Sequence, residues 1–329
     1  MFVRRPNFCV NIMFKKLIFS FFVLLFLVIS NNVTAQDVHF SQFYSNPLYL
    51  NPAYAGSVRC PRLVTNYRNQ WPSLSGNYVT YAASYDRHVD DLNGGIGVMV
   101  MADRMGDNSI GTNSLSGFYS YQIGISRSIS VRAGLQISFN QMSIDPTKFS
   151  FNDQIDPRYG FVKKTNEKID VRQKSYADFS AGGLVFSKIF YGGIAVSHIT
   201  QPDQSFIKNN SSPLPMKFTV NAGAKLKVGD DETSLSPNVI FQQQATFQTL
   251  NIGLYFTKGP FISGLWYRNQ DALISLVGLQ LNGFRFGYSY DITTSKLNKS
   301  QGSHEISASY RWYCKPKRKV FTTTNCPEF

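Results

Sequence analysis

The stretch ISVRAGLQISFN, residues 129–140, decides the fold of this chain. Apolar residues alternate with polar or small residues along its whole length. Successive side chains of a β-strand point to opposite faces, so this segment has one apolar face and one polar face. A strand of about ten residues is long enough to cross a bilayer when it is tilted. The stretch therefore predicts a membrane-crossing strand whose polar face lines an interior.

The same alternation recurs along most of the chain. The predicted strands lie near residues 62–71, 78–88, 94–105, 110–125, 128–144, 175–187, 191–200, 216–228, 234–244, 246–257, 260–269, 271–281, 283–293 and 304–314. An even number of antiparallel strands is typical of closed bacterial barrels. We therefore predict an all-β fold, a transmembrane antiparallel up-and-down β-barrel of about fourteen strands over residues 62–314.

The lengths of the connectors between these strands predict the orientation. Outer-membrane barrels have short periplasmic turns and longer outer loops. The long connectors are all odd-numbered in chain order, at residues 145–174, 201–215 and 293–303, whereas brief even-numbered connectors fall at 126–127, 190–191, 229–231, 258–259 and 282–283. This parity predicts a periplasmic N-terminus and long loops on the cell surface.

A soluble sandwich of two sheets would also show alternation, because its apolar faces pack on each other. Two observations favour the barrel. The polar faces are rich in Ser, Gly, Gln and Asn, as in a barrel lumen, and aromatic residues recur near strand ends, where membrane interfaces favour them. These aromatic residues are Tyr119, Tyr121, Tyr288, Tyr290, Trp312 and Tyr313.

The N-terminus has the pattern of a secretory signal peptide. Basic residues precede an apolar run at residues 17–29, and Val33-Thr34-Ala35 fits a cleavage site, so we predict cleavage after Ala35. A segment at 36–61 then precedes the barrel, and residues 315–329 form a basic C-terminal tail on the periplasmic side. The chain has 33 basic and 20 acidic side chains. In an exported protein this balance predicts an anionic surface or acidic protein as partner, and no nucleic acid.

Three cysteines remain after cleavage, which suggests one disulfide and one spare thiol in an oxidising compartment. Cys60 precedes the first predicted strand and Cys314 ends the last, and these strands are neighbours in a closed barrel. We predict a Cys60–Cys314 disulfide across this seam, with Cys60–Cys326 as the competing pair.

No pattern of catalytic or cofactor-binding residues stands out. His39, His88, His198 and His304 are scattered without ligand spacing, and neither a nucleophile elbow nor a phosphate-binding loop is present. We therefore predict no metal, no cofactor and no enzyme activity, although a barrel could still assemble a Ser/His pair from separate strands.

Charged residues on the polar faces have two interpretations. They form a buried network that fills the barrel, or they line a selective pore. These residues are Arg132, Arg285, Arg311, Asp291 and Glu305.

The loop segment FNDQIDPR, residues 151–158, also has competing interpretations. Asp153 and Asp156 could suggest calcium, but the glycine and terminal glutamate of a calcium loop are absent. We predict a loop held by Asp side chains that accept backbone hydrogen bonds, with partner contact through Asp153, Asp156 and Arg158 as the functional alternative.

The segment after the cleavage site resembles the start of the PorP/SprF family, outer-membrane proteins of the type IX secretion and gliding machinery of Bacteroidota. The resemblance is carried by QDVHFSQFY (36–44), by NP (46–47) and LNPAYAG (50–56), and continues in NYRNQWP (66–72), DQIDPR (153–158), QP (201–202), GYSYD (287–291), HEIS (304–307) and CP (326–327). The family-motif residues are His39, Phe40, Gln42, Tyr44, Asn51, Pro52, Tyr54 and Gly56.

The resemblance implies an outer-membrane protein that captures secreted cargo carrying a type IX C-terminal sorting domain and holds it at the cell surface. Some family members are linked instead to periplasmic ring lipoproteins of the secretion machinery. From loop position we expect cargo contacts at residues 145–175, 201–215 and 293–303, and barrel filling or machinery contact at 36–60. A porin or substrate channel remains the alternative function, and a lipid- or glycan-modifying barrel enzyme is a third.

Overall fold

The computed structural model describes residues 37–74, 76–126, 128–156, 158–162, 164–165, 171–207, 210–229, 232–295 and 300–314. The predicted signal peptide, the basic tail and Cys326 lie outside these described residues. No helix in the described part of the chain is long and apolar enough to cross a membrane.

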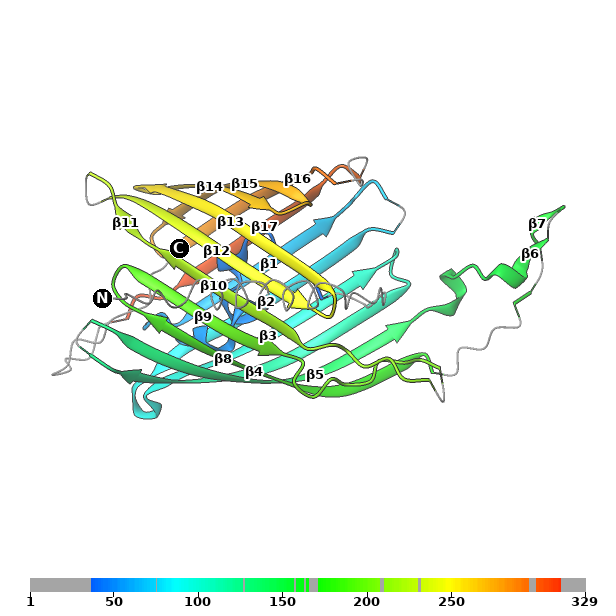
Figure 1. The fold of residues 1–329 in the computed structure, drawn as a ribbon, viewed down its shortest axis with the longest axis horizontal. Helices are drawn as coiled ribbons and strands as arrows, with labels where there is room; N and C mark the ends of the chain where they lie inside the picture. Colours follow the sequence, from blue (N-terminus) through cyan, green and yellow to red (C-terminus); the bar gives the residue numbers. More distant parts are fainter. Residues whose placement is uncertain are drawn as a thin grey trace, which may run out of the picture. The chain divides into compact units, whose positions relative to one another are not determined.

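The strands form one closed antiparallel barrel (Figure 1). They are β1 (Arg62–Gln70), β2 (Tyr78–Val89), β3 (Gly94–Met105), β4 (Ile110–Gly124), β5 (Ser130–Ile144), β8 (Gln173–Phe186), β9 (Phe190–Ser197), β10 (Lys217–Ala224), β11 (Leu226–Lys227), β12 (Thr233–Gln244), β13 (Phe247–Lys258), β14 (Phe261–Arg268), β15 (Ala272–Leu281), β16 (Phe284–Thr293) and β17 (Ser303–Arg311).

Pairing between the first and last strands closes the barrel. Arg62 of β1 lies opposite Arg311 of β17, and Gln70 lies opposite Ser303. The short strand β11 continues β10 along the same partner β12, so the two count as one and the barrel has 14 strands. The predicted fold is confirmed. One predicted strand, 216–228, is interrupted at Lys225, where the chain leaves regular pairing between β10 and β11.

The alternation of β5 appears directly in its burial. Ser130 and Arg132 are 3% and 2% exposed, whereas Leu135 and Phe139 are 62% and 54% exposed. The polar face therefore points into the barrel and the apolar face points outward. Large exposed apolar side chains recur on the outer face of nearly every strand, as a lipid-facing surface requires.

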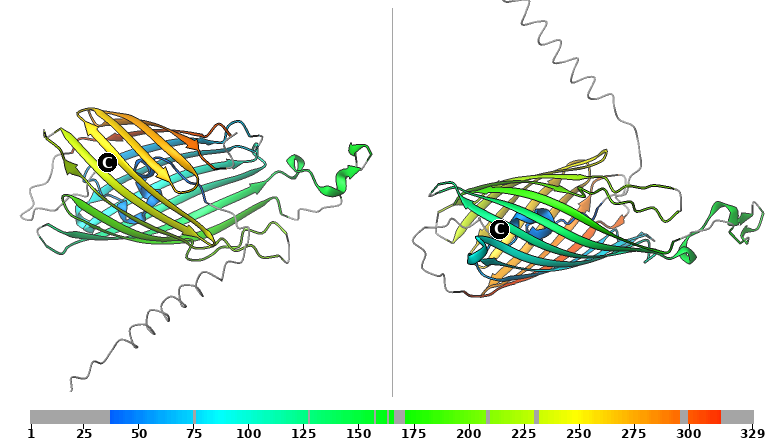
Figure 2. Two further views of the ribbon diagram at one scale, coloured as in Figure 1. Left: turned by 45° about the horizontal axis from the view of Figure 1, so that its top comes forward. Right: turned by 90° about the horizontal axis from the view of Figure 1, so that it is seen from below.

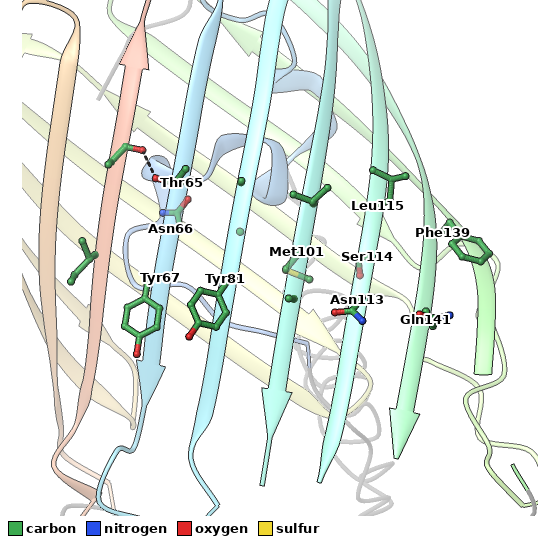
Figure 3. A pocket seen from close by; sticks show the side chains of 16 residues that line it. Thr65, Asn66, Tyr67, Tyr81, Met101, Asn113, Ser114, Leu115, Phe139 and Gln141 are labelled. Carbon is green, nitrogen blue, oxygen red and sulfur yellow. Dashed lines mark hydrogen bonds between the residues drawn. The ribbon is translucent and has the colours of Figure 1, made fainter. Parts of the chain in front are cut away.

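Figure 3 shows part of this outer face, a groove of about 630 Å³ over β1 to β5 and β17. Tyr67 and Tyr81 lie beside each other there with ring centroids 5.2 Å apart, and Leu115 and Phe139 continue the apolar lining. The groove is hollow because the side chains between these larger groups are small alanine and threonine residues. Because it opens on the lipid-facing side, we regard it as part of the membrane contact.

The connectors separate into two rims. The short-turn rim holds the turns at 90–93, 187–189, 259–260 and 282–283, the described residues 125–126, 128–129, 228–229 and 232, and Cys60 and Cys314. It includes η3 (Asp90–Leu92). The turn predicted at Phe190-Tyr191 is wrong by a few residues, because both residues belong to β9 and the turn lies at 187–189.

The opposite end of the barrel is the long-loop rim. Its longest connector joins β5 to β8 and contains η4 (Pro146–Lys148), η5 (Asn152–Gln154), and the paired strands β6 (Ile155–Asp156) and β7 (Gly160–Phe161). Figure 1 shows that this β6–β7 hairpin extends well beyond the ends of the barrel strands. The described residues of the next two long connectors, 198–207, 210–216, 294–295 and 300–302, lie at the same rim.

Residues 37–58 form a plug inside the barrel, seen as the blue segment within the ring of strands in Figure 2. The plug contains η1 (Phe43–Ser45), α2 (Pro47–Leu50) and η2 (Pro52–Tyr54). Proline suits the first positions of both α2 and η2, since its missing N–H would have no partner there. Most plug side chains from Phe40 onward are buried. They pack with inner-face strand residues in two apolar clusters, one around Phe43 and Trp266 and one around Leu48 and Phe118.

Candidate functional site

The residues singled out from the sequence lie in two separate places. The family-motif residues all belong to the plug: His39, Phe40, Gln42, Tyr44, Asn51, Pro52, Tyr54 and Gly56. Asp153, Asp156 and Arg158 belong to the β6–β7 hairpin region at the long-loop rim. The structure thus divides one predicted set into an internal cluster and an external one.

Glu305 of β17 anchors the beginning of the plug. The Ser41 N–H donates to Glu305 Oε2 at 2.6 Å, and the Gln42 N–H donates to Glu305 Oε1 at 3.3 Å. The Gln42 side chain donates to the backbone oxygen of Glu305 at 2.9 Å and accepts from the Ser307 hydroxyl at 2.6 Å. Strand β17 therefore binds both the backbone of Ser41 and Gln42 and the side chain of Gln42.

The same carboxylate belongs to a buried charge cluster. Arg68 Nη2 lies 3.2 Å from Asp291 Oδ2, and Arg68 Nη1 lies 3.3 Å from Glu305 Oε2. Arg268 approaches Asp291 at 3.5 Å, and Arg68 also donates to the Ser41 hydroxyl. All four charged side chains are at most 6% exposed.

The predicted charge network is wrong about which residues belong to it. Asp291 and Glu305 belong to it, but the described cations that pair with them are Arg68 and Arg268, which were not among the charged residues predicted from the sequence. Arg285 and Arg311 lie instead in a pocket near the short-turn rim. Arg68 stands in the family stretch at 66–72 and alternates to the inner face of β1, so strand position could have identified it.

Aromatic side chains pack at the centre of the plug. The Phe43 ring lies 4.9 Å from Trp266, and Tyr44 contacts Tyr191 at 5.7 Å with edge-to-face geometry. Tyr255 joins them 5.5 Å from Trp266. Offset and edge-to-face pairs of this kind add attraction to the burial of apolar area.

Glycines on the barrel wall make room for the rest of the plug. A Cβ atom at Gly182 would lie 2.1 Å from the Asn51 side-chain oxygen, and one at Gly134 would lie 2.3 Å from the backbone nitrogen of Ala53. In this space the Asn51 amide donates to the carbonyl of Gly183 at 3.1 Å and its oxygen accepts from the Ala53 N–H at 2.9 Å. The plug backbone therefore lies directly against the wall.

Gly56 forms the plug's last close contact. Its φ of +58° is in the left-handed region, and a Cβ there would meet Gly95 Cα at 2.6 Å, so glycine satisfies two constraints at once. The Gly56 N–H donates to Asp86 at 2.8 Å, while Arg132 and Ser120 both donate to the Ala55 carbonyl at 2.7 Å. Arg132 thus binds the plug backbone.

The remaining motif residues make individual contacts. The His39 ring lies 5.6 Å from Phe247, and Phe40 packs edge-to-face on Tyr49 at 5.1 Å. The Tyr54 hydroxyl accepts a hydrogen bond from the Asn221 side chain at 2.8 Å.

Asp37, the first described residue, is held at the long-loop rim by charged side chains. Its Oδ2 lies 2.8 Å from His198 Nε2 and 2.9 Å from Lys217 Nζ, while His198 Nδ1 lies 2.6 Å from Asp178 Oδ2. His198 therefore bridges two carboxylates. The sequence did not reveal this role, because neither Asp37 nor Asp178 lies near His198 in the chain. Burial opposes its charge, but the Asp37 charge and the hydrogen bonds that the ring donates to Asp178 and Asp37 raise the pKa of His198 to about 9.

The pH range over which the Asp37–His198 pair stabilises the fold follows from the direction in which each pKa is shifted. Burial disfavours the Asp37 carboxylate, but the Lys217 and His198 charges hold its pKa well below 3.8, so its stabilising contribution is present above that pH and is lost on acidification. His198, with its pKa raised from 6.5 to about 9, contributes fully below 6.5 and loses its contribution as the pH rises through 9.

We expect an NMR titration of the His198 ring in detergent to give a midpoint near 9. Asp37→Asn should lower this midpoint by about one unit or more, because it removes the largest charge that favours the imidazolium. Asp107→Asn, in a turn of the long-loop rim, is the control and should leave the midpoint unchanged. An ordinary midpoint near 6.5 in the unsubstituted protein would contradict the pairing.

A disulfide joins Cys60 to Cys314 with a Cα–Cα distance of 5.5 Å. These are the two cysteines favoured from the sequence, and they connect the segments that flank β1 and β17. The bond spans 254 positions of sequence, so it ties together nearly the whole barrel. A crosslink that closes so long a loop restricts the unfolded chain strongly.

Asp153 and Asp156 shape the β6–β7 hairpin region. Asp156 Oδ1 accepts from the N–H of Arg158 at 2.9 Å and from that of Tyr159 at 3.3 Å, and Asp153 accepts from the Thr165 hydroxyl at 3.0 Å. Asp156 thus accepts backbone hydrogen bonds as predicted, whereas the contact of Asp153 is with a side-chain hydroxyl. No group of three or more metal-ligating side chains occurs among the described residues.

Apolar side chains on this hairpin point into solvent. Tyr159, Phe161 and Val162 are 73%, 64% and 62% exposed, and Ile155 lies opposite Phe161 in the hairpin. Unlike the exposed residues of the strands, these lie on a loop beyond the barrel (Figure 1). Grouped apolar side chains exposed to water are typical of a contact surface for another protein. The polar residues Asp153, Asp156 and Arg158 were predicted from the sequence as partner contacts, whereas the exposed apolar residues of this hairpin were not.

Comparison with solved structures finds other barrels. The chain is similar to the Ralstonia pickettii toluene transporter TbuX (TM-score 0.49, 11% identity, 81% of this chain and 93% of that chain) and to the Acinetobacter baumannii outer membrane protein Omp33 (TM-score 0.45, 9% identity, 78% and 100%). The P. putida toluene transporter TodX gives a TM-score of 0.46 at 7% identity, covering 80% and 93%. No curated protein matches the sequence.

The family comparison covers most of the chain. Residues 32–310 match the family model described as type IX secretion system membrane protein PorP/SprF. The matched range includes the plug, the β6–β7 hairpin and nearly the whole barrel. The predicted family and the outer-membrane location are confirmed, and neither the family nor the fold is an enzyme class. This chain therefore belongs to the PorP/SprF family of type IX secretion system membrane proteins.

Proposed function

We propose that this barrel binds secreted cargo with a type IX C-terminal sorting domain and anchors it at the cell surface. The observation that carries the proposal is the exposed apolar cluster of the β6–β7 hairpin, formed by Ile155, Tyr159, Phe161 and Val162. A protein partner that covers these side chains gains their burial from water. The barrel itself serves as the membrane-held support and has no catalytic role.

The plug supports an anchoring role over transport. Its residues from Phe40 to Val58 are packed against the inner wall by hydrogen bonds, aromatic contacts and backbone-to-backbone approach. A diffusive pore needs open space along its axis, and this segment occupies that space. Single-channel recording on the purified protein tests the porin alternative directly: we expect no steady open state, and a steady conductance would favour a porin.

The short-turn rim offers a place for a second partner. Outer-membrane barrels direct their short turns toward the periplasm. Contact with periplasmic ring lipoproteins of the secretion machinery at this rim would link the anchor to the apparatus. Cargo and machinery would then bind at opposite ends of the same barrel.

The test is the double variant Tyr159→Ser with Phe161→Ser in cells that lack the native gene. We expect cargo to move from the cell surface into the medium, because the variant removes the apolar contact while leaving the strands intact. Surface proteins and culture medium are compared by mass spectrometry, and heat-modifiable migration on a gel verifies that the barrel has folded.

Tyr313→Ser is the matched control, since Tyr313 is 90% exposed but lies beside Cys314 at the opposite rim. This control should retain surface cargo. An unchanged surface proteome in the double variant would show that the hairpin does not carry cargo binding, and an unchanged surface proteome after deletion of the gene would refute anchoring altogether.

A further inference from the structure

Strand β8 extends beyond its neighbour β9 at the long-loop rim. β8 begins at Gln173, but its pairing with β9 begins only at Ala181, which lies opposite Val196. On its other side β8 pairs with β5 as far as Gln173, which lies opposite Ser143. Residues 173–180, which we call the β8 edge, therefore have a paired strand on one side and, in the described part of the chain, no strand on the other.

The backbone groups of the β8 edge show which residues face the open side. In an antiparallel sheet the N–H and C=O of one residue point to the same neighbouring strand, and this direction alternates along the chain. The Arg172 carbonyl accepts from the Ile144 N–H on the β5 side at 2.9 Å, whereas the Phe179 carbonyl accepts from the Ile199 N–H on the β9 side at 3.0 Å. Even-numbered residues of this stretch therefore bond to β5, and odd-numbered residues face the open side.

Ser175 and Ala177 are the odd-numbered residues at the centre of the β8 edge. Both are exposed to solvent. Among the described residues, no backbone group on the open side bonds to the N–H or C=O of either one. An exposed strand edge with unpaired N–H and C=O groups is a template for pairing with another chain.

The described residues of the connector after β9 contact the inward side chains of β8. Thr200 donates to Asp178 Oδ1 at 2.9 Å, and the Gln204 side chain donates to the Tyr176 hydroxyl at 2.7 Å. These contacts hold the connector on the lumen side of β8. They leave the backbone groups on the open side of the strand available to a partner.

The β8 edge lacks the features that usually prevent strand pairing. Natural proteins protect exposed edges with proline, bulges or charged side chains, lysine above all. The lysine of this stretch, Lys174, is held by the Asp203 carboxylate at 2.5 Å and the Ser205 carbonyl at 3.1 Å. The outward side chains are all uncharged: Gln173, Ser175, Ala177 and Phe179.

Polar outward side chains indicate that the end of this edge lies in water. Gln173 and Ser175 lie opposite Ser143 and Gln141 of β5, so both strands carry polar groups outward at this level. An open strand edge does not occur in the hydrocarbon layer, because its backbone groups would find no partner there. The edge is therefore accessible to a polypeptide on the side of the long loops.

We propose that the β8 edge binds an extended strand of the secreted cargo by β-strand addition. In this mode the incoming segment forms backbone hydrogen bonds along an exposed edge. The β6–β7 hairpin, with its exposed Tyr159 and Phe161, belongs to the connector that leads into β8. The inference rests on the proposed cargo binding: the hairpin supplies the apolar contact, and the β8 edge supplies the backbone contact.

A second copy of this barrel fits the β8 edge less well than a cargo strand. Strand pairing brings two backbones to about 4.8 Å, whereas sheets that meet through their side chains stay about 10 Å apart. Two barrels side by side in a membrane meet through their outward side chains. An extended segment of a secreted protein meets no such obstacle.

The test replaces both Ser175 and Ala177 by proline. Proline has no N–H and is tolerated on a strand edge where the N–H faces solvent. Because these two N–H groups do not bond to β5, the barrel should fold, which heat-modifiable migration and the Cys60–Cys314 bond verify. Ser175→Thr with Ala177→Ser is the matched control, because it changes both side chains and keeps both N–H groups.

The probe is the C-terminal domain of the surface protein that deletion of the gene releases into the medium. We expect the purified proline variant in detergent to bind this labelled domain at least about ten-fold more weakly than the unsubstituted protein, because two backbone donors are lost. The control should bind within about two-fold. In the unsubstituted protein, the bound domain should slow hydrogen exchange of the Ser175 and Ala177 amides.

Equal binding by the proline variant and its control, or unchanged amide exchange, would overturn strand addition. If Tyr159→Ser with Phe161→Ser releases cargo while the proline variant retains it, the proposed function stands and the β8 edge has no part in it. Gene deletion without effect on surface proteins would refute both. A dimer detected by light scattering that only the proline variant loses would assign the β8 edge to a second copy instead.

Discussion

Replacing Gly134 by valine is expected to displace the plug and open a conducting path through the barrel. A Cβ atom at this position would lie 2.3 Å from the Ala53 nitrogen and 2.4 Å from the Pro52 carbonyl carbon, so the plug backbone must move. A barrel of this size without a plug is wide enough for water and ions. In planar bilayers we expect a steady open state to appear in the Gly134→Val protein, whereas the unsubstituted protein should show none.

Gly117→Val provides the matched control for this experiment. Gly117 lies on the neighbouring strand β4, where a Cβ would meet only Ile137 on the outer face, at an ordinary 3.8 Å. Both substitutions place a β-branched residue in a strand, but only the one at Gly134 displaces the plug. A Gly134→Val barrel that folds, keeps its disulfide and stays closed would show that the plug does not seal the lumen.

Replacing Arg68 by leucine is expected to destabilise the barrel by about 3–5 kcal/mol. The guanidinium pairs with Asp291 and Glu305, and these three side chains are at most 2% exposed. Removing the cation leaves two carboxylates close together with weaker compensation, which costs far more than loss of a surface pair. Urea unfolding in lipid vesicles, followed by tryptophan fluorescence, measures the change in the free energy of unfolding.

A second variant separates charge from packing. Adding Asp291→Asn and Glu305→Gln to Arg68→Leu removes the uncompensated charges, so we expect the triple variant to regain part of the lost stability. Arg158→Leu on the hairpin is the surface control and should leave the unfolding midpoint nearly unchanged. A single Arg68→Leu variant as stable as the control would show that the cluster contributes little to the fold.

The barrel was predictable from the sequence because its signal is local and repeated. In a strand, each side chain's direction follows from its place in an alternating pattern, and lipid on one side with a polar interior on the other imposes that pattern on every strand. Strand ends were correct to within a few residues for β2, β3 and β5. The Cys60–Cys314 proximity followed in the same way, since closure places the first and last strands together.

The contents of the barrel were not predictable in this way. The plug has only short helical turns and no period, so its motif residues could be named from a family resemblance without any knowledge of what they contact. Phe161 of the hairpin is a large apolar residue of a type that is usually buried, and only its place in the structure shows that it is exposed.

What the sequence alone determined is thus the fold, the family, the order of the strands and the two kinds of connector. Only the tertiary structure decided that Arg68 and Arg268, rather than Arg285 and Arg311, join Asp291 and Glu305, and that His198 holds the first residues of the plug. The physical reason is distance along the chain. Alternation fixes which face of the strand a side chain occupies. Which residue that side chain contacts across the lumen depends on strand register and on the plug, whose residues lie far from their strand partners in the sequence.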